Sequence, residues 1–180
     1  PSRPSFLRWI RKAVRTFSFF NEKGGVGKSV HSVMFASYLA YGCGARVAVL
    51  DFECPRPRLR ELRTAELAQL EDPRSALSRH LAEHPHGRPW WDVVEPPLSD
   101  AVLDGVRGRA FESWMWSFVD EASGCYDYAL LDFPSGLMTV SPAFRVLCGG
   151  LVDLVAVPVD TDPVTRRVGL STAGLLRNNG

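Results

Sequence analysis

The amino-acid sequence predicts an α/β domain with a doubly wound, mainly parallel sheet. Short apolar segments typical of buried strands alternate with segments whose apolar residues recur at helical spacing. A glycine-rich loop at residues 24–27 follows the first such strand and opens a helix, and two later strands end in Asp51 and Asp132. Because ligands of this fold bind at the carboxyl ends of the strands, we expect these three places to form one site.

The individual strands and helices follow from the spacing of apolar residues. Residues 6–17 have helical spacing with basic residues between the apolar ones, and residues 16–20 form a β-prone run that leads into the glycine loop. The later strands show little alternation, as buried parallel strands do, and are expected at 46–51, 90–94, 126–132 and 151–159. Helices are expected at 28–41, 59–70, 73–84, 110–123, 141–148 and from Pro163 onward.

Composition and charge are those of an ordinary globular protein. The 180 residues are 46% apolar and 23% charged, and the formal net charge of +1 excludes a global attraction to nucleic acid. No apolar run reaches the roughly 18 residues that span a bilayer. None of the four cysteines, at 43, 54, 125 and 148, belongs to a C-x-x-C pair, which excludes a zinc ribbon and a thioredoxin-type motif. We expect reduced, mostly buried thiols in a cytoplasmic protein.

The segment FFNEKGGVGKSVHS contains a variant of a phosphate-binding loop. Gly27, Lys28 and Ser29 match the second half of the pattern G-x-x-x-x-G-K-[ST]. The first glycine of the pattern is replaced by Glu22, and a second lysine, Lys23, follows it. The chain has three lysines against eighteen arginines, and two of the three flank these glycines, which indicates a need for a compact ammonium group.

This loop and Asp132 have the chemistry of a P-loop NTPase site. Glycines let the backbone turn its N–H groups toward an anion, and the following helix points its N-terminus at the same place. Lys28 would contact the β- and γ-phosphates, the Ser29 hydroxyl would bind Mg²⁺, and Asp132 would hold that ion through water. The expected nucleotide-binding residues are Gly24, Gly25, Val26, Gly27, Lys28, Ser29 and Val30, and the expected metal site comprises Ser29, Asp51 and Asp132.

Four segments, in this order, resemble motifs of the ParA/MinD family of ATPases. KGGVGKS is similar to the family's deviant Walker A loop, VLDFECP to its second motif, YDYALLDFPSG to its Walker B segment, and DLVAVPVDTDP to the strand and turn that follow. The likeness runs through about residues 16–175. It implies an ATPase domain over residues 16–180 whose C-terminal part, with the adenine-binding residues, is missing, preceded by a basic amphipathic segment at residues 1–15.

The resemblance also gives the second lysine a role. In this family two subunits enclose two ATP molecules, and the extra lysine of each reaches the phosphates of the other; here that role falls to Lys23. Asp51 and Glu53 correspond to the two aspartates of the second motif, of which the second orients the attacking water. Glu53 adds a methylene group, and misplacement by about 1 Å can lower a rate roughly a hundredfold, so we expect slow hydrolysis. The expected catalytic residues are Lys23, Asp51 and Glu53.

The implied function is an ATP- and Mg²⁺-dependent dimerisation switch with slow ATPase activity, for DNA partition or cargo positioning. FSFFNEKGGVGKS, SYLAY and DFECP resemble the ParA-like proteins of conjugative elements. Expected partners are a second copy of the chain, non-specific DNA and a cargo-adaptor or activating protein, in a cytoplasmic protein that associates with the nucleoid. Alternatives left open are a MinD-like regulator of cell division on the membrane surface and a non-hydrolysing interaction module clamped by ATP. An iron–sulfur carrier is disfavoured because the cysteines are not paired.

Other features have plainer interpretations that we prefer. Arg56, Arg58, Arg60 and Arg63 could contact DNA phosphates, but a solvated helix face accounts for them. The basic segment at residues 6–17 could lie on an anionic membrane, although packing as an extra helix is favoured. A metal site is possible at His80, His84 and His86, but it is disfavoured because no cysteine or carboxylate completes a ligand set. A partner surface is possible at Trp90, Trp91, Trp114 and Trp116, but ordinary packing in the core or an interface is preferred.

Overall fold

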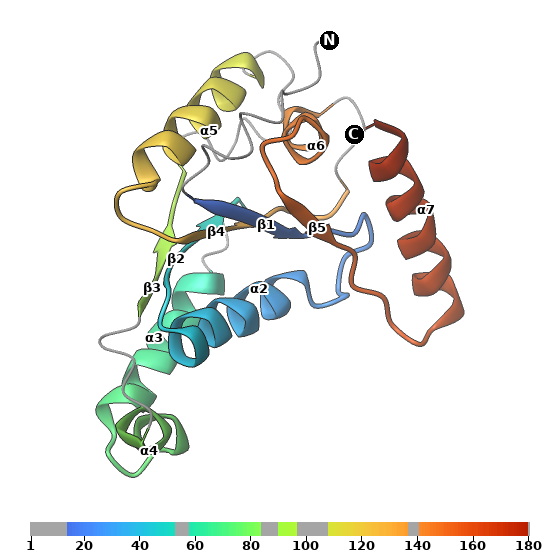
Figure 1. The fold of residues 1–180 in the computed structure, drawn as a ribbon. Helices are drawn as coiled ribbons and strands as arrows, with labels where there is room; N and C mark the ends of the chain where they lie inside the picture. Colours follow the sequence, from blue (N-terminus) through green and yellow to red (C-terminus); the bar gives the residue numbers. More distant parts are fainter. Residues whose placement is uncertain (1–13, 53–57, 84–89, 97–107, 137–140, 180) are drawn as a thin grey trace.

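The computed structural model describes residues 14–52, 58–83, 90–96, 108–136 and 141–179. Within them a single five-stranded sheet has the order β3-β2-β4-β1-β5 (Figure 1). Its strands are β1 (Arg15–Phe19), β2 (Arg46–Asp51), β3 (Trp90–Val94), β4 (Tyr128–Asp132) and β5 (Leu154–Ala156). All four pairings between neighbours are parallel, which confirms the predicted α/β fold with a parallel sheet.

Helices cover both faces of this sheet. In Figure 1, α2 (Lys28–Ser37), α3 (Arg58–Glu71) and α4 (Ala76–Glu83) lie on one side, and α5 (Gly108–Ala122) and α6 (Pro142–Cys148) lie on the other. The last helix, α7 (Pro163–Asn179), stands beyond β5. Helices on both faces are what a doubly wound sheet requires, because each connection between parallel strands must cross over one face.

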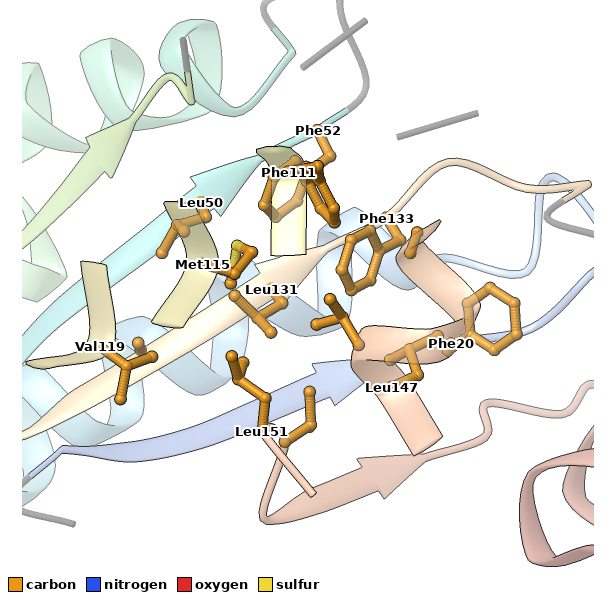
Figure 2. Packing of buried hydrophobic residues seen from close by; sticks show 14 of the residues in the cluster. Phe20, Leu50, Phe52, Phe111, Met115, Val119, Leu131, Phe133, Leu147 and Leu151 are labelled. Carbon is orange, nitrogen blue, oxygen red and sulfur yellow. The ribbon is translucent and has the colours of Figure 1, made fainter. Parts of the chain in front are cut away.

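Strand residues alternate between two apolar clusters, one on each face. Leu50 of β2 and Leu131 of β4 face α5 and α6 within the cluster drawn in Figure 2. Their neighbours Val49 and Leu130 belong to the second cluster, with α2 and α3. At the carboxyl end of the sheet, the rings of Phe52 and Phe133 stack with centroids 4.7 Å apart, and Phe111 of α5 packs edge-on against Phe52. On the face covered by α5 and α6, apolar packing therefore extends to the point where the loops begin.

The helix expected at 28–41 changes its winding near its end. α2 stops at Ser37, and Tyr38–Gly42 continue as a π-helix. Leu39, Ala40 and Tyr41 are all buried there, although they are consecutive in the sequence. A wider turn lets three successive side chains face the core, which regular α-helical spacing does not.

The strand expected at 151–159 is much shorter than its apolar run. Only Leu154–Ala156 pair with β1, since Leu151 and Val152 are buried in the core ahead of the strand. Pro158, which has no N–H to donate, follows the strand. The first part of the apolar run therefore records burial ahead of a short strand, whereas Val159 at its end is exposed. The other expected helices are present with shifted ends, and the strand expected at 126–132 begins at Tyr128.

Two expectations about the chain's periphery are corrected. The helical spacing of residues 6–17 does not give a helix at its described end, because Arg15 already belongs to β1 and pairs with Tyr128; residues 1–13 lie outside the described part. The described cysteines are free thiols, but Cys43 and Cys125 are exposed and Cys148 is only half-buried. The expectation of mostly buried thiols is wrong for these three.

Gly169 is the point at which α7 comes close to the chain that follows β5. A Cβ atom on Gly169 would fall on Cγ1 of Val159, whereas a Cβ atom on Gly174 of the same helix would meet nothing within 4 Å. We expect Gly169→Ala to lower the free energy of unfolding by about 1–3 kcal/mol through overpacking. Gly174→Ala should instead raise it by up to about 1 kcal/mol, because alanine favours helix. Chemical denaturation of both variants measures this, and equal stabilisation of the two would contradict the packing of α7.

Candidate functional site

The loop between β1 and α2 has a backbone that only glycine adopts without strain. Gly25 and Gly27 have φ angles of 77° and 81°, in the left-handed region. Gly27 directly precedes α2, which begins at Lys28 and carries no acidic side chain in its first turn. The positive end of the helix is therefore not neutralised from within that turn, and its N–H groups can bind an anion held in the loop.

A second loop, residues 133–136 after β4, packs on the first. The N–H of Gly136 donates to the carbonyl oxygen of Glu22 over 3.1 Å. A Cβ atom on Gly24 would lie 3.2 Å from Oγ of Ser135, tighter than most contacts of real side chains. Glycine at position 24 thus allows the two loops to approach closely, and a movement of one loop would displace the other.

Two carboxylates lie side by side at the carboxyl end of the sheet. Asp51 and Asp132 are register partners in neighbouring strands, and they are 7% and 1% exposed. Ser32, on the inner face of α2, donates from its hydroxyl to Oδ1 of Asp132 over 3.3 Å. Lys28, at the start of the same helix, is also buried, at 8% exposure. Buried acidic groups are stable only beside cations or donors, and this set of oxygens next to a phosphate-type loop fits Mg²⁺.

The two lysines of the loop have different surroundings. Lys28 is buried at the start of α2, whereas the side chain of Lys23 is 37% exposed. Nζ of Lys23 is 3.4 Å from Oδ2 of Asp162 and donates a hydrogen bond to Oγ1 of Thr165, both at the start of α7. The structure thus gives different surroundings to two lysines that are only five positions apart in the sequence.

The side chain of Asn21 holds the beginning of this loop in place. It is fully buried, donates to the carbonyl oxygen of Pro158 over 2.9 Å, and accepts from the backbone N–H of Lys23 over 2.9 Å. The first bond ties the loop to the chain after β5, and the second sets the direction in which the loop leaves β1. A buried amide with both groups satisfied gives a unique arrangement, because any other would leave polar atoms unpaired.

Sequence reasoning located the loop and both aspartates but missed the residues that support them. Asn21, Ser32, Ser135, Asp162 and Thr165 contact the predicted residues and were not among them. The only local signal is at α7, where an aspartate before a proline is typical of a helix start. The predicted Glu53 lies outside the described residues. Val26 and Ser29 are half-buried, and Val30 is exposed on α2.

The arginine, tryptophan and histidine groups gain no support as binding sites where the structure describes them. Arg63 hydrogen-bonds Tyr41 and Glu66 and lies over the ring of Trp91, and Arg60 pairs with Glu95. Trp91 itself is fully buried. His84, His86, Arg56 and the side chains of His80 and Arg58 are outside the described part. Among described residues, no group of three or more histidines, cysteines or acidic residues could hold a metal ion. No described helix combines the length and apolarity of a membrane span.

Comparison with known proteins agrees with this geometry. Residues 17–122 match the family model of the CobQ/CobB/MinD/ParA nucleotide binding domain. No relative among the curated proteins matches the sequence.

Solved structures with the same fold include protein DIP2308 from Corynebacterium diphtheriae (24% identity, TM-score 0.55, covering 90% of this chain and 64% of that one). A plasmid partition protein from Borrelia burgdorferi is 14% identical, with a TM-score of 0.57 and coverage of 92% and 73%. The kinase domain of the Escherichia coli tyrosine kinase ETK is 16% identical, with a TM-score of 0.54 and coverage of 95% and 66%.

The chain thus spans about two thirds of the length of these solved structures, and at such identities they share its fold. The family match covers more than half of the chain, including the glycine loop, both loop lysines and Asp51. Together with the paired carboxylates at the carboxyl end of a parallel sheet, it identifies the chain as a member of the CobQ/CobB/MinD/ParA family of nucleotide-binding domains.

Proposed function

We propose that the protein is an ATP-binding, slowly hydrolysing dimerisation switch that partitions DNA or positions another cargo. The observation that carries this proposal is the different setting of the two lysines of one loop. Lys28 is buried at the start of α2, where it can contact phosphates bound in its own subunit. Lys23 lies at the rim, with a side chain that is 37% exposed, where it can serve phosphates bound by a second subunit.

The chain's own residues divide the work of the site. The backbone of Gly24–Val30 and the side chain of Lys28 bind the phosphates, and the hydroxyl of Ser29 together with Asp132 and Asp51 would hold Mg²⁺. When bound, Mg²⁺ would neutralise charge that builds up on the transferred phosphoryl group. Glu53 is proposed to orient the attacking water, and Lys23 to add a cation from the neighbouring subunit, as an arginine finger does.

The proposed surface on which the switch works is non-specific DNA. The likeness to a plasmid partition protein supports this choice, as do the segments that resemble ParA-like proteins of conjugative elements. A cargo-adaptor or activating protein would then couple hydrolysis to movement of a plasmid, chromosome or conjugative element. The protein would act in the cytoplasm, in contact with the nucleoid.

Replacement of the two lysines should separate nucleotide binding from dimerisation. Lys28→Ala is expected to abolish ATP binding, because the loop loses its buried cation. Lys23→Ala should retain ATP binding, within about tenfold of the wild-type dissociation constant, but lose the ATP-dependent dimer. Binding of a fluorescent ATP analogue and analytical ultracentrifugation with ATP and Mg²⁺ measure the two properties.

The third lysine offers a control for the loss of one positive charge. Lys12→Ala should behave as the wild type in both measurements, since residue 12 lies outside the loop. If Lys23→Ala forms the ATP-dependent dimer at wild-type strength, a role for Lys23 across the interface is ruled out.

The function itself is tested by binding to random-sequence duplex DNA. The purified protein is titrated with ATP, with ADP and without nucleotide at about 100 mM salt, because non-specific affinity depends steeply on salt. We expect binding with ATP only, and loss of that binding in both Lys23→Ala and Lys28→Ala. An absence of DNA binding in every nucleotide state would contradict a DNA-partition role. Liposomes of anionic lipid would then test the membrane-surface alternative.

A further inference from the structure

The amino group of Lys23 is held by the first turn of α7 in the same chain. Its Nζ lies 3.4 Å from Oδ2 of Asp162 and donates a hydrogen bond to Oγ1 of Thr165. Asp162 is 139 positions away in the sequence, so the contact depends on the tertiary fold. The pair is at the rim of the site, where the side chains of Lys23 and Asp162 are 37% and 47% exposed.

Asp162 is prepared to receive this lysine because it also caps α7. Its Oδ2 accepts from the backbone N–H of Thr165 over 2.8 Å and from the Thr165 hydroxyl over 2.9 Å. These hydrogen bonds, and then the nearby Lys23, hold the pKa of the Asp162 carboxyl below its usual value. The carboxylate is therefore charged at neutral pH.

The hydroxyl of Thr165 completes a chain of hydrogen bonds. It donates to Asp162 and accepts from Lys23, so each of the two bonds polarises the other. Thr165 is only 2% exposed, which fixes the position of its hydroxyl. The backbone of Lys23 is fixed as well, through the amide of Asn21. The backbone and the side chain of Lys23 are thus both held by the segment that runs from Pro158, after β5, to Thr165 in the first turn of α7.

We propose that Asp162 and Thr165 form an intrachain dock for Lys23, which keeps this lysine in its own subunit and must release it before the ATP-dependent dimer can form. This inference rests on the proposed function, in which Lys23 acts on phosphates of a second subunit. Asp162 is then a positioning residue that sets the ATP and protein concentrations at which the dimer appears. A bound partner phosphate and the dock compete for one ammonium group.

The expected size of the effect follows from the exposure of the ion pair. An exposed pair of this kind changes an equilibrium by about 1.4- to 5-fold. Because a symmetric dimer would break two such docks, their loss should lower the dimer dissociation constant by about 2- to 25-fold.

Asp162→Asn tests the dock with little change to the helix. Asparagine remains a good helix cap but removes the negative charge. Asp160→Asn is the matched control, because Asp160 is an exposed neighbour whose side chain bonds Thr161 and not Lys23. The first readout is the rate at which acetic anhydride acetylates Lys23 in the nucleotide-free protein, followed by mass spectrometry. We expect acetylation to be about 1.4- to 5-fold faster in Asp162→Asn and unchanged in Asp160→Asn.

The second readout is the ATP-dependent dimer itself, measured by analytical ultracentrifugation. Asp162→Asn should dimerise at lower protein concentration than wild type and Asp160→Asn, and this gain should vanish when it is combined with Lys23→Ala. Unchanged acetylation would disprove the dock, and faster acetylation without a tighter dimer would disprove its control of the switch. If no variant dimerises with ATP, the proposed function fails, while acetylation still decides whether the dock exists.

Discussion

The register between β2 and β4 determines where the charged groups of the site lie. It places Asp51 beside Asp132, and it sends alternate side chains of both strands into two separate apolar clusters. A slip of one residue would exchange the two faces and bury the aspartates among leucines and phenylalanines. The stacked rings of Phe52 and Phe133, the next residues on each strand, pack in the same register. Apolar packing thus fixes the spacing of two carboxylates whose mutual repulsion would otherwise separate them.

The loop that carries both lysines depends on that sheet through Asn21. Its buried amide joins the loop to the chain after β5, so the β5 side of β1 contributes to the shape of the site. Ser32 makes the comparable link on the other side, between α2 and Asp132. The loop's conformation is therefore not a property of its glycines alone. The glycines permit the left-handed turns at Gly25 and Gly27, and the buried polar contacts select which of the permitted shapes is adopted.

The sequence alone was sufficient to predict the features that are encoded locally. The strand–loop–helix around Lys28, the aspartates at two strand ends and the parallel sheet follow from short-range patterns, and all are present. It could not predict that Lys23 meets Asp162 and Thr165, since no local pattern links residues about 140 positions apart. The π-helix at Tyr38–Gly42 and the short β5 were also missed, because apolar runs report burial without specifying the backbone that achieves it.

The balance of charge explains why one loop would need two lysines. The described site combines two neighbouring buried carboxylates with a buried lysine at the start of α2, and a nucleoside triphosphate with one Mg²⁺ would add further net negative charge. Backbone N–H groups at the start of α2 would offset part of this charge, but a site closed from water would need a further cation beside Lys28. Under the proposed function, Lys23 would supply one only by leaving Asp162, so closing the site on ATP and joining a second subunit would be a single event. An additional buried lysine in the same subunit would satisfy the charge just as well, but it would leave nucleotide binding and association uncoupled.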